Sequence, residues 1–396
     1  MKILFIGARL FDDVDFYLKE KNIESVLTES NPKASNLNLA DKYFIVPRGM
    51  EEPIEIAKKE NVDGIISLIG IDDPLMDVAI AKEYVESKLK IPFIASNTYT
   101  VSISSDKIKT KEFFIDNDID TSRFKVLNSF DFDQSINELK TSQNFVENNC
   151  NLENNKLNLP LVLKQRSGQG GRDICVAKNM EDVNEYFSNF DEVLCEEFIE
   201  GSEISIEVLC FKNEYIPLVP VYKGETSLDG THPLNKTRCA PANIVDLDNN
   251  YVKKIAYKIA EKLKAEGTID IDFIFSKNDK KLYALEINTR PSGTRYLTAA
   301  STGINPLNKL VDMVSGDFSF INKQIKNYFA LEIPIGSFNG KKSDEYPKKF
   351  TENSWVVHGP SNYERLTISG ESKEKTMNLA KELLGENFHD YNLNIL

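Results

Sequence analysis

The sequence is poor in the residues that build disulfide frameworks and simple metal sites. It contains five cysteines and three histidines in 396 residues. The cysteine count is odd and no Cys-x-x-Cys pair occurs, which argues against both disulfide pairing and a thiolate zinc site. The histidines, His232, His358 and His389, are too scattered to suggest a metal triad. We therefore expect reduced thiols and a cytoplasmic protein.

Positive charge and long apolar runs are also scarce. Lys and Arg number 48 against 61 Asp and Glu, which gives a net charge of −13. Such an acidic chain does not offer the broad basic surface that duplex nucleic acid requires, so we expect no nucleic-acid partner. The apolar run near the N-terminus, residues 3–6, is far shorter than a membrane span or the apolar part of a secretion signal. We therefore expect no membrane association.

The composition that remains is that of an ordinary globular protein, with 41% hydrophobic and 28% charged residues. At roughly 150 residues per domain, the length predicts two to three domains. Residues 1–100 alternate short apolar runs with helical stretches, which is typical of a parallel sheet with crossover helices. The turn after the first run, Gly7-Ala8-Arg9-Leu10, lacks the further glycines of a dinucleotide-binding fingerprint, so we do not expect NAD to bind there.

The middle of the chain favours antiparallel strands. Runs at 159–164 and 174–177 flank a glycine-rich turn and predict a hairpin, and runs at 268–275 and 281–287 predict a second antiparallel pair. We further predict strands at 192–198, 203–211 and 216–222, helices at 106–114, 180–187 and 251–265, and more strands and a helix after about residue 330. The Asn-rich stretch 144–158 is expected to be a loop without assigned chemistry.

The turn of the first hairpin is suited to phosphate. Lys164 ends its first strand, and Ser167, Gly168, Gly170 and Gly171 follow. Glycines let backbone amides approach phosphate oxygens closely, and a lysine supplies the counter-charge. The alternative is a plain turn in which the glycines only provide positive φ angles.

A second motif is an acidic strand that turns at a glycine. Its residues of interest are Glu196, Glu197, Phe198 and Ile199, followed by Gly201, Ser202 and Glu203. One interpretation is a solvated edge strand. The other is a linker whose backbone groups read the edge of an adenine while a carboxylate accepts hydrogen bonds from ribose hydroxyls.

A third motif supplies oxygen ligands on neighbouring strands. Side chains two apart in a strand share a face, so Asp272 on one strand can face Glu286 and Asn288 on the next. Such hard oxygen ligands suit Mg²⁺, which takes one or two carboxylates and completes its shell with phosphates and water. Apolar neighbours on both strands indicate burial, where unpaired carboxylates would be costly.

The order of these motifs, preceded by Asp106-Lys107, resembles the ATP-grasp superfamily over roughly residues 1–325. The stretches 288–295, 301–306 and 313–316 make it most similar to halves of carbamoyl-phosphate synthetase large chains and to related amino-acid ligases. The resemblance implies an α/β and α+β fold: a Rossmann-like parallel domain, an ATP-grasp domain with a lid lobe and a metal-site lobe, and a small C-terminal α+β extension. The implied boundaries are 1–100, 101–327 (lobes at about 125–195 and 196–327) and 328–396.

The resemblance also implies roles for individual residues. Lys107 and Lys164 would contact the ATP phosphates, with Ser167, Gly168, Gly170 and Gly171 folding over them as a lid. The adenine would be read by the Glu197 carbonyl and the Ile199 amide of the linker Glu196-Glu197-Phe198-Ile199, and the ribose by Glu203.

Metal and catalytic roles follow from the same resemblance. Glu286 would bridge two Mg²⁺ ions, for which Mn²⁺ could substitute, and Asp272 and Asn288 would complete their shells. Arg290 would stabilise a developing acyl phosphate, and Arg238 would add a phosphate or substrate contact.

The implied activity is that of an ATP-dependent carboxylate-amine ligase. ATP would phosphorylate a carboxylate, and an amine would then displace phosphate from the acyl phosphate, with amino acids or small peptides as substrates. Two alternatives stay open: bicarbonate activation, for which the chain has the length of only one synthetase half, and a non-catalytic ATP-binding regulator. A homodimer through the N-terminal domain or the C-terminal extension is compatible with the sequence. Loops at 224–240 and 290–302 are expected to form the substrate pocket.

Overall fold

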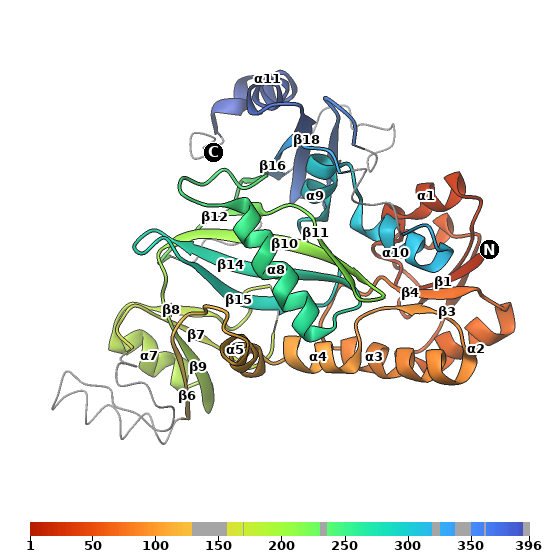
Figure 1. Cartoon of the computed structure of the whole chain (residues 1–396), viewed down its shortest axis with the longest axis horizontal. Helices are drawn as coiled ribbons and strands as arrows, with labels where there is room; N and C mark the ends of the chain where they lie inside the picture. The colour runs from red at the N-terminus through yellow and green to blue at the C-terminus, as the bar shows by residue number, and fades with distance from the viewer. Residues whose placement is uncertain are drawn as a thin grey trace.

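The computed structural model contains three β-sheets, which divide the chain along its length (Figure 1). It describes residues 1–128, 157–168, 170–229, 236–318, 325–336, 350–359 and 362–390. Two of the gaps bear on the predictions. Residues 129–156 include most of the Asn-rich stretch 144–158, and residues 230–235 include His232. Across the described ranges, every helix is too short or too polar to cross a membrane.

The N-terminal domain is a five-stranded parallel sheet with the strand order β3-β2-β1-β4-β5. Its strands are β1 (Lys2–Ile6), β2 (Glu24–Glu29), β3 (Lys42–Ile45), β4 (Gly64–Ser67) and β5 (Phe93–Ile94). Its helices are α1 (Asp15–Glu20), α2 (Glu51–Glu60) and α3 (Leu75–Tyr84), with a short 3₁₀ turn η1 (Phe11–Asp13) after β1. The prediction of a parallel sheet with crossover helices is confirmed.

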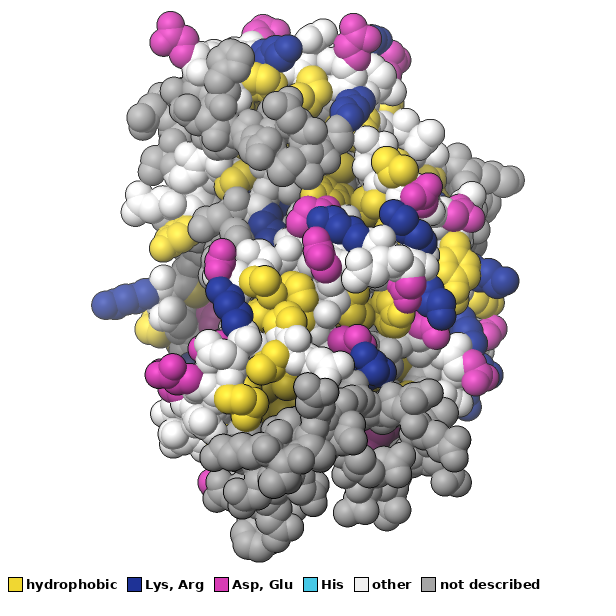
Figure 2. Space-filling model, turned by 90° about the vertical axis from the view of Figure 1, so that its left-hand side faces the viewer, with side chains coloured by type: hydrophobic (Ala, Val, Ile, Leu, Met, Phe, Trp, Pro, Cys, Tyr) yellow, Lys and Arg dark blue, Asp and Glu magenta, His cyan; other side chains and the backbone are white. Residues whose placement is uncertain are grey.

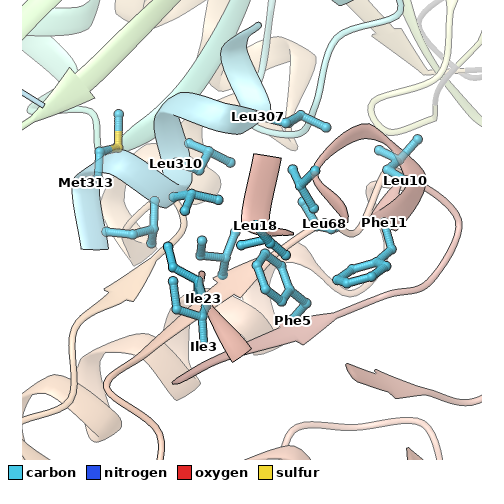
Figure 3. Close-up of a cluster of buried hydrophobic side chains, with 14 of the residues drawn as sticks. Ile3, Phe5, Leu10, Phe11, Leu18, Ile23, Leu68, Leu307, Leu310 and Met313 are labelled. Carbon is cyan, nitrogen blue, oxygen red and sulfur yellow. The ribbon is translucent and has the colours of Figure 1, made fainter. Parts of the chain in front are cut away.

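One face of this parallel sheet is covered by a helix that comes from far along the chain. Figure 3 shows Leu307, Leu310 and Met313 of α10 (Pro306–Ser315) packed against Ile3 and Phe5 of β1 and their neighbours. These side chains are nearly inaccessible to solvent, so the contact contributes hydrophobic stabilisation. The N-terminal domain is therefore anchored to the rest of the molecule by a shared core.

The second sheet has four strands in the order β6-β9-β7-β8. They are β6 (Phe124–Asn128), β7 (Leu161–Lys164), β8 (Cys175–Ala177) and β9 (Glu192–Glu197), and α7 (Met180–Phe187) packs on them. The predicted hairpin is present as the antiparallel pair β7 and β8. Asn179 begins α7 with a capping box, because its side chain accepts from the amide of Asp182 and the Asp182 carboxylate accepts from the amide of Asn179.

The third sheet is nine-stranded and antiparallel. It contains β10 (Gly201–Phe211), β11 (Glu214–Pro217), β12 (Val221–Glu225), β13 (Arg238–Ala240), β14 (Gly267–Ser276), β15 (Leu282–Asn288), β16 (Phe329–Gly336), β17 (Trp355–His358) and β18 (Glu364–Gly370). The helices around it are α4 (Thr98–Ser104), α5 (Lys107–Asp116), α8 (Asn249–Leu263), α9 (Arg295–Thr302) and α11 (Lys373–Leu384). Apolar residues of α8 and α5 pack on β10, β14 and β15 to form its main core.

One detail differs from the sequence expectations. The strand predicted at 216–222 is two strands, β11 and β12, because Pro217 and Pro220 lack the N–H that a continuous ladder needs. The strands predicted after about residue 330 are β16, β17 and β18, which continue the nine-stranded sheet through β13. Our domain boundaries remain a prediction.

Candidate functional site

A cavity of about 190 Å³ lies between the four-stranded and the nine-stranded sheet. Its lining contains six of the residues predicted to bind nucleotide, Lys164, Glu196, Glu197, Phe198, Ile199 and Glu203. Apolar side chains come from both sheets: Val162 and Val176 on one, Ile274 and Leu285 on the other. Two facing apolar walls beside the linker backbone fit a flat aromatic base.

The Glu196 carboxylate is held inside a buried cluster of lysines. Its Oε2 lies 2.7 Å from Lys111 Nζ and accepts a 2.7 Å hydrogen bond from the Ser122 hydroxyl, and its Oε1 lies 3.0 Å from Lys164 Nζ. Burial opposes ionisation here, but Lys111 and Lys164 outweigh it and lower the pKa of Glu196 to about 2. The Glu196 side chain therefore positions Lys164 at the cavity wall.

The linker residues and Glu203 also have partners of their own. Arg123 donates to both carboxylate oxygens of Glu197, at 2.7 and 2.9 Å. Lys236 Nζ donates to Glu203 Oε1 at 2.8 Å and to the Glu225 carbonyl at 2.9 Å. The Glu203 carboxylate thus lies at the cavity and already accepts a hydrogen bond from Lys236. A ribose hydroxyl that binds Glu203 would have to displace Lys236 or bind the same carboxylate beside it.

The glycine turn is joined to the start of α5. Lys107 Nζ donates to the Gly168 carbonyl at 2.7 Å, and the Lys107 amide donates to the Arg166 carbonyl at 2.9 Å. Gly170 and Gly171 have φ angles of +68° and +79°, while a Cβ on either would meet no atom within 4 Å. Glycine is therefore favoured at these two positions because of the positive φ angle, and not because a side chain would clash with a neighbouring atom. Ser167 is exposed beside them.

Lys107 and Lys164 are close enough to influence each other and the metal-ligand candidates. Burial lowers the pKa of Lys107, Lys164 lowers it further, and Glu286 opposes both effects. Glu286 also acts to raise the pKa of Lys164, after the larger effect of Glu196. The two ammonium groups and the Glu286 carboxylate therefore share one electrostatic neighbourhood.

The metal-ligand candidates lie face to face on β14 and β15. Asp272 pairs with Glu286 across the strands, and Asp270 pairs with Asn288. Asp272 Oδ1 lies 2.6 Å from Lys223 Nζ, and Ser205 donates to Asp270 at 2.5 Å. Burial first, and then Asp270 and Glu286, raise the pKa of Asp272 to about 8 against the opposing effect of Lys223. Lys164, Lys223 and Lys107 act against burial to lower the pKa of Glu286, so the lysines around this face favour its ionised form.

This donor set fits Mg²⁺. Within the described residues no group of three or more His, Cys, Asp or Glu side chains could hold a metal by itself. Mg²⁺ does not need such a group, because it binds one or two carboxylates and takes its other ligands from phosphates and water. Asp272 and Glu286, with the Asn288 amide, supply that minimum on a face where Asp272 is buried and the other two side chains are half-buried.

The two predicted catalytic arginines have different environments. Arg290 Nε donates to Asp72 Oδ1 at 2.6 Å and its Nη2 to Asn288 Oδ1 at 3.3 Å, so it lies next to the metal-ligand candidates. Arg238 is buried, and its Nη1 lies 3.3 Å from Glu332 Oε1. Glu332 also accepts from Arg365 at 2.6 Å, so the Arg238 guanidinium helps to join β13, β16 and β18. Its described contacts are those of a structural ion pair.

Four charged residues at or beside the site were absent from the predicted set: Arg9, Lys111, Lys223 and Lys236. Lys111 follows Lys107 by one helical turn, which is a signal that the sequence contained. Lys223, on β12, meets β14 only through β10, and no local pattern reports that pairing.

Comparison with known proteins gives three concordant results. The model of the ATP-grasp domain matches residues 132–294. Carbamoyl-phosphate synthase of Methanobrevibacter smithii is 50% identical over 386 residues, covering 97% of this chain and 100% of that protein. The carbamoyl phosphate synthase large chain of Helicobacter pylori is 25% identical over 338 residues, covering 79% of this chain and 29% of the large chain.

Among solved structures, the biotin carboxylase domain of 2-oxoglutarate carboxylase from Hydrogenobacter thermophilus, determined with MgADP, ADP and bicarbonate, is similar at a TM-score of 0.70. It is 18% identical, and the match covers 97% of this chain and 89% of that one, so this likeness shows the fold. The 50% identity over nearly the whole chain shows the family. The chain therefore belongs to the ATP-grasp family of ATP- and Mg²⁺-dependent ligases, as a homologue of carbamoyl-phosphate synthase.

Proposed function

We propose that this ligase phosphorylates a small carboxylate with ATP and transfers the resulting acyl group to an amine. In the first step a carboxylate oxygen attacks the γ-phosphorus and ADP leaves. In the second the amine attacks the acyl carbon, phosphate leaves and the amine loses a proton. The observation that carries the proposal is the convergence of Lys107, Lys164 and Glu286 beside the cavity between the two sheets.

Within this proposal the lysines bind polyphosphate. Lys107 and Lys164 offer two cations to the phosphates, and the buried Glu196 and Lys111 hold Lys164 in place. The glycine turn carries Lys107 through its contact with Gly168, so closure of the turn and phosphate binding are coupled. A closed turn excludes water, which would otherwise hydrolyse the acyl phosphate.

The nucleoside would lie in the cavity. The backbone of Glu197 and Ile199 would bind the adenine edge, and Glu203 would accept from the ribose hydroxyls. The side chain of Glu197 is already engaged by Arg123, which leaves its backbone as the group that faces the ligand.

Asp272, Glu286 and Asn288 would hold the metal, for which we propose two Mg²⁺ ions with Mn²⁺ as a substitute. Bound Mg²⁺ neutralises charge on the transferring phosphoryl group. Arg290, next to Asn288, would bind the carboxylate oxygen on which phosphate is placed.

We also propose a cytoplasmic enzyme of small-molecule substrates. The described cysteines, Cys175, Cys195, Cys210 and Cys239, are all free, which is the usual state in a reducing compartment. Homodimer formation stays a prediction, and light scattering on the purified chain would measure it.

A second candidate reaction is the activation of bicarbonate to carboxyphosphate. The relative from Methanobrevibacter smithii carries the name carbamoyl-phosphate synthase and is matched over its full length by 386 residues. The length of the chain, about one synthetase half, is therefore a weaker argument against this reaction than the sequence alone suggested.

The test is ADP release from Mg-ATP against amino acids singly and in pairs, with bicarbonate plus ammonia as a separate arm. Release that needs two organic partners and yields a new amide mass supports the ligase. Release with bicarbonate in place of an organic acid supports carboxyphosphate chemistry. ATP binding without release in any arm would contradict both and favour a regulator.

A further inference from the structure

The carboxyl end of the parallel sheet faces the metal-site lobe through two loops. The strand order is β3-β2-β1-β4-β5. After β1 the chain adds β2 and β3 on one side of β1, and then β4 and β5 on the other side. In open α/β sheets, ligands bind outside the carboxyl ends of the strands where the order reverses in this way. The loops after β1 and β4, residues 7–14 and 68–74, flank that point.

Arg9 connects these two loops. Its Nη2 donates to the Gly70 carbonyl at 3.4 Å. A Cβ added to Gly70 would lie 2.1 Å from Arg9 Nη2, so the absence of a side chain at residue 70 makes room for the guanidinium. The sequence motif of this turn indicated no role for Arg9.

Two arginines of the metal-site lobe reach the same loops. Arg290 Nε donates to Asp72 Oδ1 at 2.6 Å, two residues beyond Gly70. Arg295 Nε donates to Asp13 Oδ2 at 2.7 Å, four residues beyond Arg9. Three guanidinium groups from two domains therefore meet where the parallel sheet faces the metal-ligand candidates.

The positive charge at this point is only partly neutralised. Arg290 and Arg295 each have a carboxylate partner, whereas Arg9 forms no ion pair with any described residue. Burial lowers the pKa of Arg9, and Arg295 and Arg290 lower it further, while Asp13 opposes them. Arg9 is thus a guanidinium without a carboxylate partner near two other guanidinium groups. Its planar set of N–H donors is suited to bind a carboxylate or phosphate of a ligand.

We propose that Arg9 binds a second anionic group of the acid substrate, while Arg290 beside it binds the reacting carboxylate, so that the substrate bears a carboxylate or phosphate besides the carboxylate that reacts. Arg290 bridges from Asn288 to Asp72, so it spans the distance between the metal-ligand candidates and the loop that Arg9 contacts. The inference rests on the proposed function and narrows its substrate class.

The test compares acid substrates with and without a second anionic group. ADP release from Mg-ATP with ammonia is measured for alanine, for aspartate and glutamate, for phosphoserine and for bicarbonate. We expect one of the dianionic acids to support release, and the carboxylate and phosphate arms identify which group is bound. In Arg9→Ala the KM for that acid should rise about tenfold, the loss of one charge-assisted pair, with the KM for ATP unchanged.

Two further variants separate binding from general damage. Gly70→Ala should reproduce the effect of Arg9→Ala, because the new methyl group displaces the guanidinium while the backbone at residue 70 tolerates alanine. Arg9→Lys should recover part of the affinity, since an ammonium keeps the charge and loses the fork. Arg48→Ala, at an exposed arginine of the same domain, is the control and should leave both KM values unchanged.

The outcomes distinguish this inference from the proposed function. Release that depends on an organic acid, with Arg9→Ala acting equally on monoanionic and dianionic acids, overturns the inference alone. Release with bicarbonate as the best acid overturns it and supports the alternative reaction. No release with any acid overturns the proposed function and the inference with it.

Discussion

Two buried acidic clusters, both on strands that border the nucleotide cavity, differ in how their charge is balanced. Glu196 on β9 has two lysines within 3.0 Å and a pKa lowered to about 2. Asp272 on β14 faces Glu286, has one lysine, and its buried position raises its pKa to about 8. The first cluster is neutralised by lysines of the chain, and we propose that a divalent cation binds the second.

The difference explains why similar residues should respond in opposite ways to neutral substitution. Removing one charge of a buried ion pair leaves the other charge buried without a counter-ion, which costs several kcal/mol of stability. Removing the Asp272 carboxylate, whose pKa is raised by burial, Asp270 and Glu286, relieves repulsion in the absence of metal. Stability and activity together therefore distinguish a structural carboxylate from a ligand.

The largest effect is expected for Glu286→Gln. This substitution removes the carboxylate that we propose binds both Mg²⁺ ions. ADP release should therefore fall about a thousandfold or more. The melting temperature without metal should fall, as circular dichroism would show, because Lys164, Lys223 and Lys107 lower the pKa of Glu286 against burial and would lose its counter-charge. Glu214→Gln, at an exposed position on β11, is the matched control. Retained release in Glu286→Gln would contradict the metal assignment.

Glu196→Gln should chiefly reduce stability. Lys111 is 1% exposed, so loss of its counter-ion leaves a buried ammonium, and the free energy of unfolding should fall by about 3 kcal/mol. Urea denaturation measures the change. Glu192→Gln makes the same chemical change at an exposed residue of the same strand, and should cost less than about 0.5 kcal/mol. Equal effects of the two variants would argue against a balanced cluster.

The same cluster predicts a pH dependence. The pKa of Glu196 is lowered from its model-compound value of 4.5 to about 2, so its contribution to stability is fully present above pH 4.5. That contribution is lost as the pH falls toward 2, and it amounts to about 3 kcal/mol at neutral pH. Denaturation midpoints between pH 5 and 3 should fall less steeply in Glu196→Gln than in the wild type. Parallel curves would show that another group dominates acid unfolding.

The smallest effect is expected for Gly170→Ala. The position has a φ of +68° and open space around the missing Cβ, so alanine adds strain of about 1 kcal/mol without a clash. The KM for ATP should rise severalfold while kcat changes little, as steady-state ADP release would show. Gly385→Ala, at a glycine after α11 with a φ of +57° and open space around the missing Cβ, is the control for backbone strain as such.

Prediction from sequence worked best where one strand or one turn carries the signal. The alternation of side chains placed Asp272 opposite Glu286, and the run of glycines located the turn that Lys107 contacts. It worked less well where prolines divide a run, as at Pro217 and Pro220, because β-propensity alone does not register a missing N–H.

The sequence by itself determined the fold class, the order of the motifs and the chemical type of the site. These depend on local periodicity and on residue types at short spacing. Only the tertiary structure decided the balance of charge: that Glu196 is neutralised by Lys111 and Lys164, and that Arg9 meets Arg290 across two domains. Electrostatic interactions depend on distance in space and on burial, and neither can be obtained from spacing along the chain.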